Sequence, residues 1–157
     1  MRNGEQYETA NGRTARSIKI VKAAYTQPLL YYGGNLMDIS QNKLFAALKE
    51  QNVDIEGTLS RFMGNDELYI KFLTRYPDEN DVTPVIEAAA SGDNDRLVMT
   101  AHKLKGVSIN LGLNGIAEKA GAIESGAKNR TLDDPDAAAA ELKAEYDTIC
   151  RIIKENI

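Results

Sequence analysis

Several residue types on which common protein chemistries depend are scarce in this sequence. Its 157 residues include one cysteine, one histidine and no tryptophan, and aromatic residues make up only 6%. A single cysteine excludes an internal disulfide framework and is compatible with a reducing compartment. One histidine with one cysteine also excludes the usual zinc sites, which need three or four nitrogen or sulfur ligands. Any chemistry that requires an imidazole can therefore take place only at His102.

Long hydrophobic runs and an excess of positive charge are missing as well. No apolar stretch approaches the roughly 18 residues that span a bilayer, so we expect a soluble, cytoplasmic protein without a membrane partner. Lysine and arginine number 19 against 23 acidic residues, and the net charge is −4. Affinity for a phosphate backbone comes largely from clustered cations. We therefore expect no nucleic-acid partner, and we interpret the basic residues within 1–22 as part of a solvated leader.

The N-terminal part of the chain differs in pattern from the remainder. Residues 1–37 show no sustained hydrophobic period and contain a turn-rich break at Tyr31–Asn35. We interpret them as an arm or linker that is partly disordered. From residue 38 onward, apolar residues recur at helical spacing between start and stop signals. Residues 38–157 are therefore predicted to form one helical domain.

Helical segments follow one another along this domain. They are predicted at 38–51, 54–63, 66–76, 84–90, 93–111, 116–128 and from about 134 to the C-terminus. Candidate N-terminal caps are Asp38 or Ser40, Asn65, Thr83, Asp93, and Asp133 or Asp134. Pro77 predicts a helix end at Tyr76, because a residue before proline avoids the helical region. Gly112 or Gly115 is expected to separate the helices on either side.

Signals for β-hairpins and internal repeats are absent from the sequence. Several helices joined by short loops favour an all-α fold. We predict an antiparallel, up-down-up-down four-helix bundle with extra short helices at its N-terminal side. From the segment 66–76, the core is expected to receive Leu68, Ile70, Phe72 and Leu73.

The helix Asp93–Leu111 carries the single histidine on a distinct face. At about 100° per residue, its aliphatic and small residues gather opposite His102. This predicted core stripe consists of Leu97, Thr100, Ala101, Leu104, Val107, Ser108 and Leu111. On the side of the imidazole lie Val98, Met99, Lys105, Gly106 and Ile109. The imidazole is therefore predicted to point away from the core.

A single histidine in a helical protein is most often an exposed residue with no function. Three features of the surroundings of His102 argue against this interpretation here. Gly106 costs about 1 kcal/mol relative to alanine in a helix interior, and it stands where a side chain would obstruct approach to His102. Lys105, three residues after the histidine, can place an ammonium near whatever the imidazole carries. Val98, Met99 and Ile109 place apolar groups on the outer face, as docking surfaces do.

These features together describe an accessible nucleophilic nitrogen. With an ordinary pKa near 6.5, an imidazole is substantially neutral at cytosolic pH and can accept a phosphoryl group on a ring nitrogen. Lys105 would offset the added negative charge. Onward transfer needs a metal ion and an acceptor carboxylate in line. We find no metal-ligand pattern near His102, so a partner is expected to supply both.

Residues 101–112 read Ala-His-Lys-Leu-Lys-Gly-Val-Ser-Ile-Asn-Leu-Gly. This segment closely resembles the signature A-H-x-L-K-G-x-S/A-x-x-L-G of histidine-containing phosphotransfer (HPt) domains. Residues 61–69 are similar to the R-F-x-G-D/N-x-x-L-Y opening of the family's second helix, and residues 91–93 and 120–124 also fit. The resemblance covers about residues 38–157. Many members have a long second helix, which is interrupted here at residues 76–81, so we expect a break or kink there.

The resemblance implies roles for individual residues. His102 would be the phosphoacceptor, Lys105 would hydrogen-bond the phosphoryl oxygens, and Gly106 would keep the site open. The partners would be the receiver domain of a response regulator, a hybrid histidine kinase, or both. The receiver would supply Mg²⁺, and the chain would have no cofactor of its own. We expect a small, transient interface in which Val98, Met99 and Ile109 dock the receiver while Lys103 and Lys105 steer its acidic pocket.

We therefore expect a monomeric phosphoryl carrier rather than an enzyme, since no Gly-rich nucleotide box indicates a kinase. Three alternatives remain open. The chain could be the phosphoacceptor module of a larger hybrid kinase, or a helical interaction module that carries no phosphate. Intact His102, Lys105 and Gly106 speak against the inert module. A hydrolase with His102 as general base would need a cleft with an orienting carboxylate, which we do not expect on an apolar, convex surface.

Overall fold

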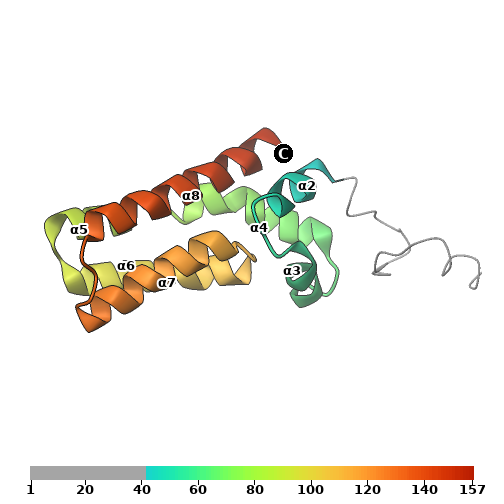
Figure 1. Cartoon of the computed structure of the whole chain (residues 1–157). Coiled ribbons are helices and arrows are strands. Elements are labelled where there is room, and N and C mark those ends of the chain that lie inside the picture. Colours follow the sequence, from blue (N-terminus) through green and yellow to red (C-terminus); the bar gives the residue numbers. More distant parts are fainter. Residues whose placement is uncertain (1–41) are drawn as a thin grey trace, which may run out of the picture. The chain divides into compact units, whose positions relative to one another are not determined.

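Residues 42–157, which the computed structural model describes, form helices joined by short loops (Figure 1). The helices are α2 (Lys43–Lys49), α3 (Ile55–Arg61), α4 (Asp66–Glu79), α5 (Thr83–Ser91), α6 (Asn94–Asn110), α7 (Asn114–Asn129) and α8 (Pro135–Glu155). The predicted all-α class is confirmed for this part of the chain, and none of its helices is long and apolar enough to cross a membrane. The predicted arm, residues 1–37, lies outside the described residues.

Side-chain caps account for most of the helix starts. Each cap accepts a hydrogen bond from a backbone N–H that the first turn leaves unpaired. The capping residues are Asn42, Asp54, Asn65, Asp93 and Asp134. The predicted caps Asn65 and Asp93 are confirmed, and Asp134 is the one used of the two candidates for the last helix. The first helix starts later than predicted, since Asn42 caps it, and the candidates Asp38 and Ser40 lie outside the described residues.

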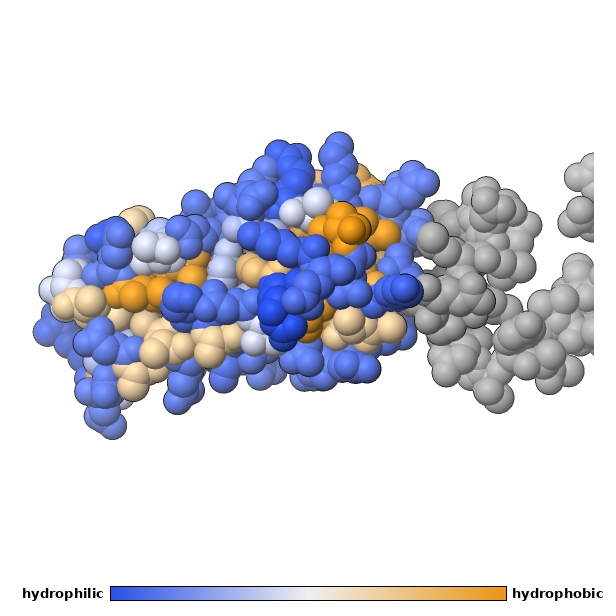
Figure 2. Space-filling view, turned by 90° about the horizontal axis from the view of Figure 1, so that it is seen from above, coloured by the Kyte–Doolittle hydropathy of each residue, from blue (hydrophilic) through white to orange (hydrophobic). Residues whose placement is uncertain are grey.

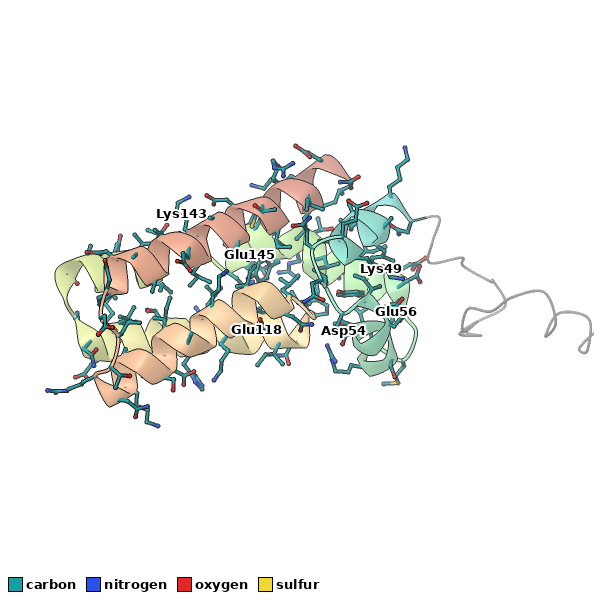
Figure 3. All side chains as sticks on the ribbon, in the orientation of Figure 1. Lys49, Asp54, Glu56, Glu118, Lys143 and Glu145 are labelled. Atoms are coloured by element: carbon teal, nitrogen blue, oxygen red, sulfur yellow. The ribbon has the colours of Figure 1, made fainter. Side chains whose placement is uncertain are left out.

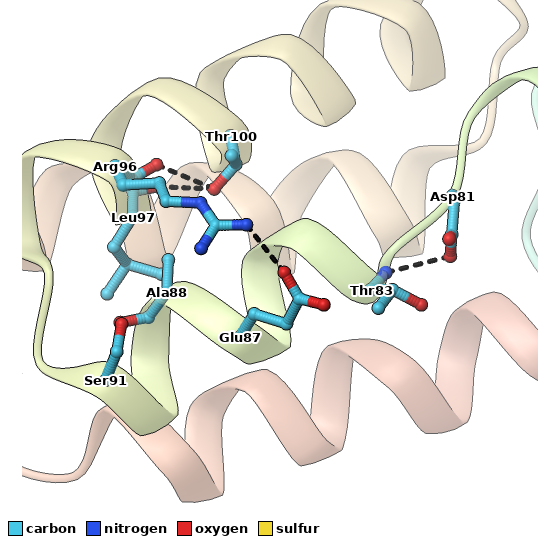
Figure 4. Close-up of polar contacts among 8 residues, drawn as sticks. All are labelled: Asp81, Thr83, Glu87, Ala88, Ser91, Arg96, Leu97 and Thr100. Carbon is cyan, nitrogen blue, oxygen red and sulfur yellow. Dashed lines mark hydrogen bonds and ion pairs between the residues drawn. The ribbon is translucent and has the colours of Figure 1, made fainter.

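The cap predicted for α5 is wrong. Thr83 is the first helical residue rather than the cap, and no side-chain hydrogen bond comes from Val82 before it. Asp81 takes the capping role instead, because its carboxylate accepts the Thr83 N–H at 2.8 Å (Figure 4). The end of α5 is as expected, since Gly92 adopts a left-handed conformation with φ +67°. Next to this corner Arg96 of α6 donates to Glu87 of α5 at 2.6 Å.

The predicted helix end at Tyr76 is also wrong, because α4 continues through Pro77 to Glu79. A proline inside a helix removes one backbone hydrogen bond, and contacts with α8 hold the helix around Pro77. Tyr76 is fully buried and its ring packs 5.8 Å from that of Tyr146. The Tyr146 hydroxyl donates to the Pro77 carbonyl at 3.1 Å. The interruption expected at residues 76–81 occurs at Asn80, between α4 and α5.

Helices α5 to α8 pack in a closed cycle. α6 contacts α5 and α7, and α8 contacts α5 and α7, while α2 and α4 also pack on α8. In Figure 1, α8 runs above the α6–α7 pair. Seen from above, the described surface is mostly hydrophilic, with apolar residues in small separate areas (Figure 2). Most apolar side chains of the described residues are buried in one cluster between the helices.

The core stripe predicted for α6 is confirmed in most of its positions. The buried members are Leu97, Ala101, Leu104, Ser108 and Leu111, whereas Thr100 and Val107 are half-buried. On α4 the expectation is only partly right. Leu73 is buried and Ile70 is half-buried, but Leu68 and Phe72 are exposed. The stripe of α4 that faces the core is formed by Tyr69, Leu73 and Tyr76, and a helix can bury only one such stripe.

A tight turn joins α6 to α7 and is held by α3. Gly112 has φ +72°, a conformation that side chains other than glycine rarely adopt. The Asp54 N–H donates to the Gly112 carbonyl at 3.0 Å. A Cβ at residue 112 would lie 2.6 Å from the Asp54 carbonyl oxygen, so no larger residue fits. Of the two glycines predicted as separators, Gly112 forms the turn. Gly115 lies in the first turn of α7, where a Cβ would come too close to the carboxylate of Glu145 of α8 (Glu145 is labelled in Figure 3).

Two buried tyrosines anchor α4 to the C-terminal half of α6. The Tyr69 hydroxyl donates to the Leu111 carbonyl at 2.7 Å, and the hydroxyls of Tyr76 and Ser108 lie 3.0 Å apart. Ser108 donates in turn to the Leu104 carbonyl at 2.8 Å. Burial raises the pKa of both tyrosines well above the ordinary value, so both hydroxyls stay protonated. These bonds fix the helix that carries His102.

The substitution Tyr69→Phe tests this anchoring. It leaves the buried Leu111 carbonyl without its tyrosine donor, and a buried polar group that loses its partner costs about 1–3 kcal/mol. We expect the free energy of unfolding, measured by urea denaturation, to fall by about that amount. Thr148→Val is the control, because it removes a hydroxyl that also bonds a backbone carbonyl but on the exposed side of α8. Equal losses in the two variants would contradict the anchoring role.

Candidate functional site

α6 presents His102 to solvent. The side chain is 69% exposed, whereas its neighbours Ala101 and Leu104 are buried on the opposite face of the helix. The structure therefore gives His102 the orientation that the helical period predicts. Because the tyrosine bonds and the core stripe fix the helix, the position of the imidazole is defined by the fold.

A carboxylate from α7 holds the ring in one orientation. Oε1 of Glu124 lies 2.8 Å from Nδ1 of His102, and Oε2 of the same carboxylate lies 2.6 Å from Nζ of Lys105. Hydrogen bonds from Lys105 and from His102 hold the pKa of Glu124 below its ordinary value, so the carboxyl is ionised at neutral pH. An ionised carboxylate can only accept, so Nδ1 carries the hydrogen and the neutral ring has its lone pair on Nε2.

Sequence reasoning missed Glu124 as a site residue, although the segment 120–124 was part of the family resemblance. The sequence feature that could have identified Glu124 is the position of the turn between α6 and α7. In an antiparallel helical pair, residues equally distant from the turn lie opposite one another. His102 and Glu124 are each eleven residues from Leu113, just after Gly112. Once Gly112 was known to form the turn, this symmetry would have identified Glu124.

The same symmetry explains a glycine in α7. Lys105 and Gly121 are each eight residues from Leu113. A Cβ on Gly121 would lie 3.3 Å from Cδ of Lys105, which is closer than ordinary packing. The bare backbone of Gly121 therefore lets the aliphatic part of Lys105 cross α7 and place its ammonium on Glu124. His102, Lys105 and Glu124 form one hydrogen-bonded group, called the His–Glu–Lys cluster below.

Gly106 lies one turn after His102 on the exposed side of α6. A Cβ built on it would meet nothing within 4 Å, and its backbone is ordinary helix. Nothing in residues 42–157 therefore requires a glycine at this position. Glycine lowers the stability of the helix at this position, and no neighbouring atom would exclude a larger side chain.

An open pocket of about 540 Å³ lies beside His102. It is lined by Asn94, Asp95, Val98, Met99, His102, Glu124, Lys128 and Arg130. The expectation of a convex surface without an orienting carboxylate is therefore wrong. The reason is that α7 runs alongside α6, so Glu124, Lys128 and Arg130 form a second wall. Within the described residues, no three His, Cys, Asp or Glu side chains are grouped as they would be around a metal ion.

The residues predicted for docking fall on two sides of His102. Met99, 65% exposed, and the half-buried Val98 line the pocket. Ile109, 51% exposed, lies two turns further along α6, where its carbonyl accepts a hydrogen bond from Arg61 of α3. Lys103 is exposed on α6 and does not line the pocket. The structure therefore does not bring all four residues together in one place.

Sequence reasoning also missed an apolar surface on α4 and the end of α3. Met63, Leu68 and Phe72 are exposed there, with Met63 at 73%. The ring of Phe72 packs 5.7 Å from that of the half-buried Phe62. These residues are called the α3–α4 patch. Arg61, two residues before Met63, reaches the Ile109 carbonyl of α6. Their exposure could not be read from periodicity, which predicts core positions for Leu68 and Phe72.

The substitution Gly106→Ala tests whether the fold needs this glycine. Because a Cβ there meets no other atom, alanine should raise the free energy of unfolding by about 0.5–1 kcal/mol through helix propensity. Chemical denaturation of both proteins measures the difference. Gly121→Ala, on the neighbouring helix, is the control, because its Cβ would press on Lys105 and should bring a smaller gain. A loss of stability in Gly106→Ala would show that the fold requires glycine there.

Comparison with known proteins agrees with the sequence pattern. A family model described as "Hpt domain" matches residues 72–151, about half of the chain. The match includes α5, α6 and α7, and with them the whole His–Glu–Lys cluster. No match was found among curated proteins or among solved structures. Hpt domains take part in phosphotransfer in two-component signalling and are phosphocarriers rather than kinases. The resemblance noted in the sequence is therefore confirmed, and the chain belongs to the Hpt domain family.

Proposed function

We propose that this protein is a phosphoryl carrier in a phosphorelay. His102 accepts a phosphoryl group on Nε2 and exchanges it with the aspartate of a receiver domain in a response regulator or hybrid kinase. The observation that carries the proposal is the bond between Nδ1 of His102 and Glu124, because in the neutral ring it places the hydrogen on Nδ1 and the lone pair on Nε2, and the ring is 69% exposed. Membership of the Hpt domain family gives this geometry its chemical context.

The bonds formed and broken in the transfer step require no cofactor bound to this chain. Nε2 attacks the phosphorus of a receiver aspartyl phosphate, the N–P bond forms, and the O–P bond breaks with its electron pair on the aspartate. The proton stays on Nδ1 beside Glu124. Lys105 offsets charge on the phosphoryl oxygens, and Gly106 leaves space for the approach of the partner. In-line transfer of this kind depends on positioning and on a metal ion, and the Mg²⁺ comes with the receiver domain.

We also propose an architecture and a cellular setting for the carrier. α4 and α5 together form one arm of an antiparallel, up-down four-helix bundle, interrupted at Asn80, and α6, α7 and α8 form the others. The short helices α2 and α3 precede it. The protein acts as a cytoplasmic monomer, has no kinase activity, and meets its partner through a small, transient interface.

The docking surface surrounds His102 on both sides. We assign Val98 and Met99 to the pocket side and Ile109 to the other, with Lys103 attracting the acidic pocket of the receiver. Five of the six large hydrophobic side chains that are exposed in residues 42–157 lie on α6 or in the α3–α4 patch. Met99 among them lines the pocket beside His102, where an apolar contact would favour the binding of a partner.

The alternative is a helical interaction module that keeps the fold but carries no phosphate. Such a module has no use for a neutral imidazole with a free Nε2, for an ammonium one turn away, or for a glycine that the fold does not require. The cluster geometry and the open space at Gly106 therefore favour the carrier.

The substitution His102→Gln tests the carrier function. The protein is incubated with Mg²⁺ and the phosphorylated receiver domains of its own host, and the label on the protein is followed. We expect wild type to acquire an acid-labile, base-stable label and His102→Gln to acquire none. Because His102 is exposed, the variant should keep the helical circular dichroism of wild type.

The two possible failures of this experiment have different meanings. Label on the His102→Gln variant would place the phosphoacceptor elsewhere in the chain. No label on wild type from any receiver of the host would favour the interaction module.

The substitution Met99→Asp tests the docking surface. Placing a charge in an apolar contact should raise the KM for a phosphorylated receiver about tenfold, which corresponds to about 1.4 kcal/mol, with kcat little changed. Ile157→Asp is the matched control, because Ile157 is also 66% exposed but lies at the C-terminal end of the chain. Steady-state transfer kinetics measure both variants. An unchanged KM in Met99→Asp would remove this residue from the interface.

A further inference from the structure

The helices α2, α3, α5, α6 and α7 end in the same hydrogen-bonded turn. One residue of the turn is left-handed and its N–H donates to the carbonyl three residues earlier, while the next N–H donates to the carbonyl five residues earlier. The left-handed residues, with φ between +54° and +72°, are Asn52, Met63, Gly92, Gly112 and Arg130. Glycine and asparagine accept this conformation, whereas longer side chains are disfavoured in it. Met63 and Arg130 are therefore the exceptions.

Backbone contacts hold Arg130 in this conformation at the end of α7. Its N–H donates to the Ala127 carbonyl at 3.2 Å, and the Thr131 N–H donates to the Gly126 carbonyl at 2.8 Å. The Ala127 carbonyl also accepts a hydrogen bond of 3.0 Å from the side chain of Asn94, at the start of α6. None of these bonds uses the arginine side chain. Glycine, the usual residue at such a position, would form the same turn.

The exposed side chain of Arg130 has no acidic partner within residues 42–157. The other four arginines of this part of the chain form ion pairs with carboxylates; they are Arg61, Arg75, Arg96 and Arg151. The C-terminal end of a helix favours a nearby cation, but Lys128 in the last turn of α7 already supplies one. Neither the backbone nor an ion pair therefore accounts for an arginine at residue 130.

Arg130 lines the pocket beside His102 together with the exposed Lys128. Two carboxylates also line this pocket. Glu124 is already bound within the His–Glu–Lys cluster, and Asp95 forms no ion pair with any described residue. The pocket thus keeps two cations against the single carboxylate of Asp95, in a chain whose net charge is −4. This local excess of positive charge suits an anionic group on a partner.

The α6 side of the same pocket is apolar, since Val98 and Met99 line it. A ligand that contacts both sides therefore carries an anionic group next to apolar ones, as a protein surface does where an acidic residue borders apolar residues. The planar guanidinium of arginine matches a carboxylate with two parallel hydrogen bonds. The pocket is open, so a side chain on the surface of another protein can enter it.

We propose that Arg130 binds an acidic side chain on the surface of the receiver domain that docks at His102. This inference rests on the proposed function and adds a residue that selects the partner. The acidic side chain lies outside the pocket of the receiver that holds Mg²⁺, because the carboxylates of that pocket are occupied by the ion. Receivers without an acidic residue at the facing position bind more weakly. The unfavourable conformation of Arg130 lowers the stability of the free protein, and the arginine increases affinity in the complex.

The first experiment separates this role from a structural one. Arg130→Gly removes the side chain and relieves the left-handed conformation, so its midpoint of urea denaturation should equal or exceed that of wild type. Arg130→Ala is the control, because it removes the guanidinium but keeps the unfavourable conformation, and its midpoint should be lower than that of Arg130→Gly. A midpoint for Arg130→Gly below that of wild type would show that the arginine serves the fold, and the proposal would be overturned.

The second experiment measures partner binding. Unphosphorylated receiver domains of the host are titrated into the protein, and the Kd is obtained from fluorescence anisotropy. We expect the Kd to rise about tenfold in Arg130→Gly and further in Arg130→Glu, and the difference from wild type to shrink as salt is added. Arg151→Gln is the matched control, because Arg151 is an exposed arginine on α8 that is bound to Glu155. Equal affinities of wild type and Arg130→Gly would refute the proposal.

A charge exchange identifies the carboxylate. Single acidic residues on the surface of the receiver are changed to lysine, and one of these variants should bind Arg130→Glu more tightly than it binds wild type. If none does, a carboxylate of the receiver is not the ligand of Arg130.

The outcomes also separate this inference from the proposed function. A receiver that binds through Arg130 but exchanges no phosphoryl group with His102 refutes the proposed function and leaves the inference standing. A receiver that exchanges the phosphoryl group at the same KM with wild type and with Arg130→Gly does the opposite. If no receiver of the host binds wild type, both fail.

Discussion

The register between α6 and α7 is the constraint on which the candidate site depends. It is set by the turn at Gly112, which the Asp54 N–H binds at 3.0 Å. A slip of one residue along a helix moves a side chain by 1.5 Å and turns it by about 100°. Such a slip in α7 would remove Glu124 from His102 and place a side chain where Gly121 now lies. One tight turn therefore decides whether three groups on two helices meet.

The rest of the fold keeps this helical pair in place while leaving its outer face free. Buried aliphatic residues fix one face of α6, and the hydroxyls of Tyr69 and Tyr76 fix its C-terminal half from α4. The stabilising contacts thus lie on the side of α6 opposite His102. This separation lets the exposed face carry features that do not favour stability, namely a helix glycine and solvated apolar side chains. A reactive group on a rigid element needs little reorganisation when a partner arrives.

Local signals in the sequence were sufficient for the helices and for the direction of His102. Helical periodicity and cap residues act within a few positions, so Asp93 and the core face of α6 were predictable. Contacts between distant segments were not. Tyr146 binds the carbonyl of Pro77 from 69 residues away, and Glu124 reaches His102 across a turn whose position two glycines left open. The exposure of Leu68 and Phe72 depends on which side of α4 meets its neighbours, and periodicity alone cannot give that.

The residues that hold the turn at Gly112 lie before the region that the family model matches. Asp54 and Thr58 precede residue 72, where the match to the Hpt domain family begins, yet their atoms leave room only for a glycine at position 112. The segment that carries the recognisable signature is thus shorter than the unit that enforces its geometry. Two chains could share every residue of the signature and still differ in how firmly their acceptor is held, through a short helix that comparison of the signatures would pass over.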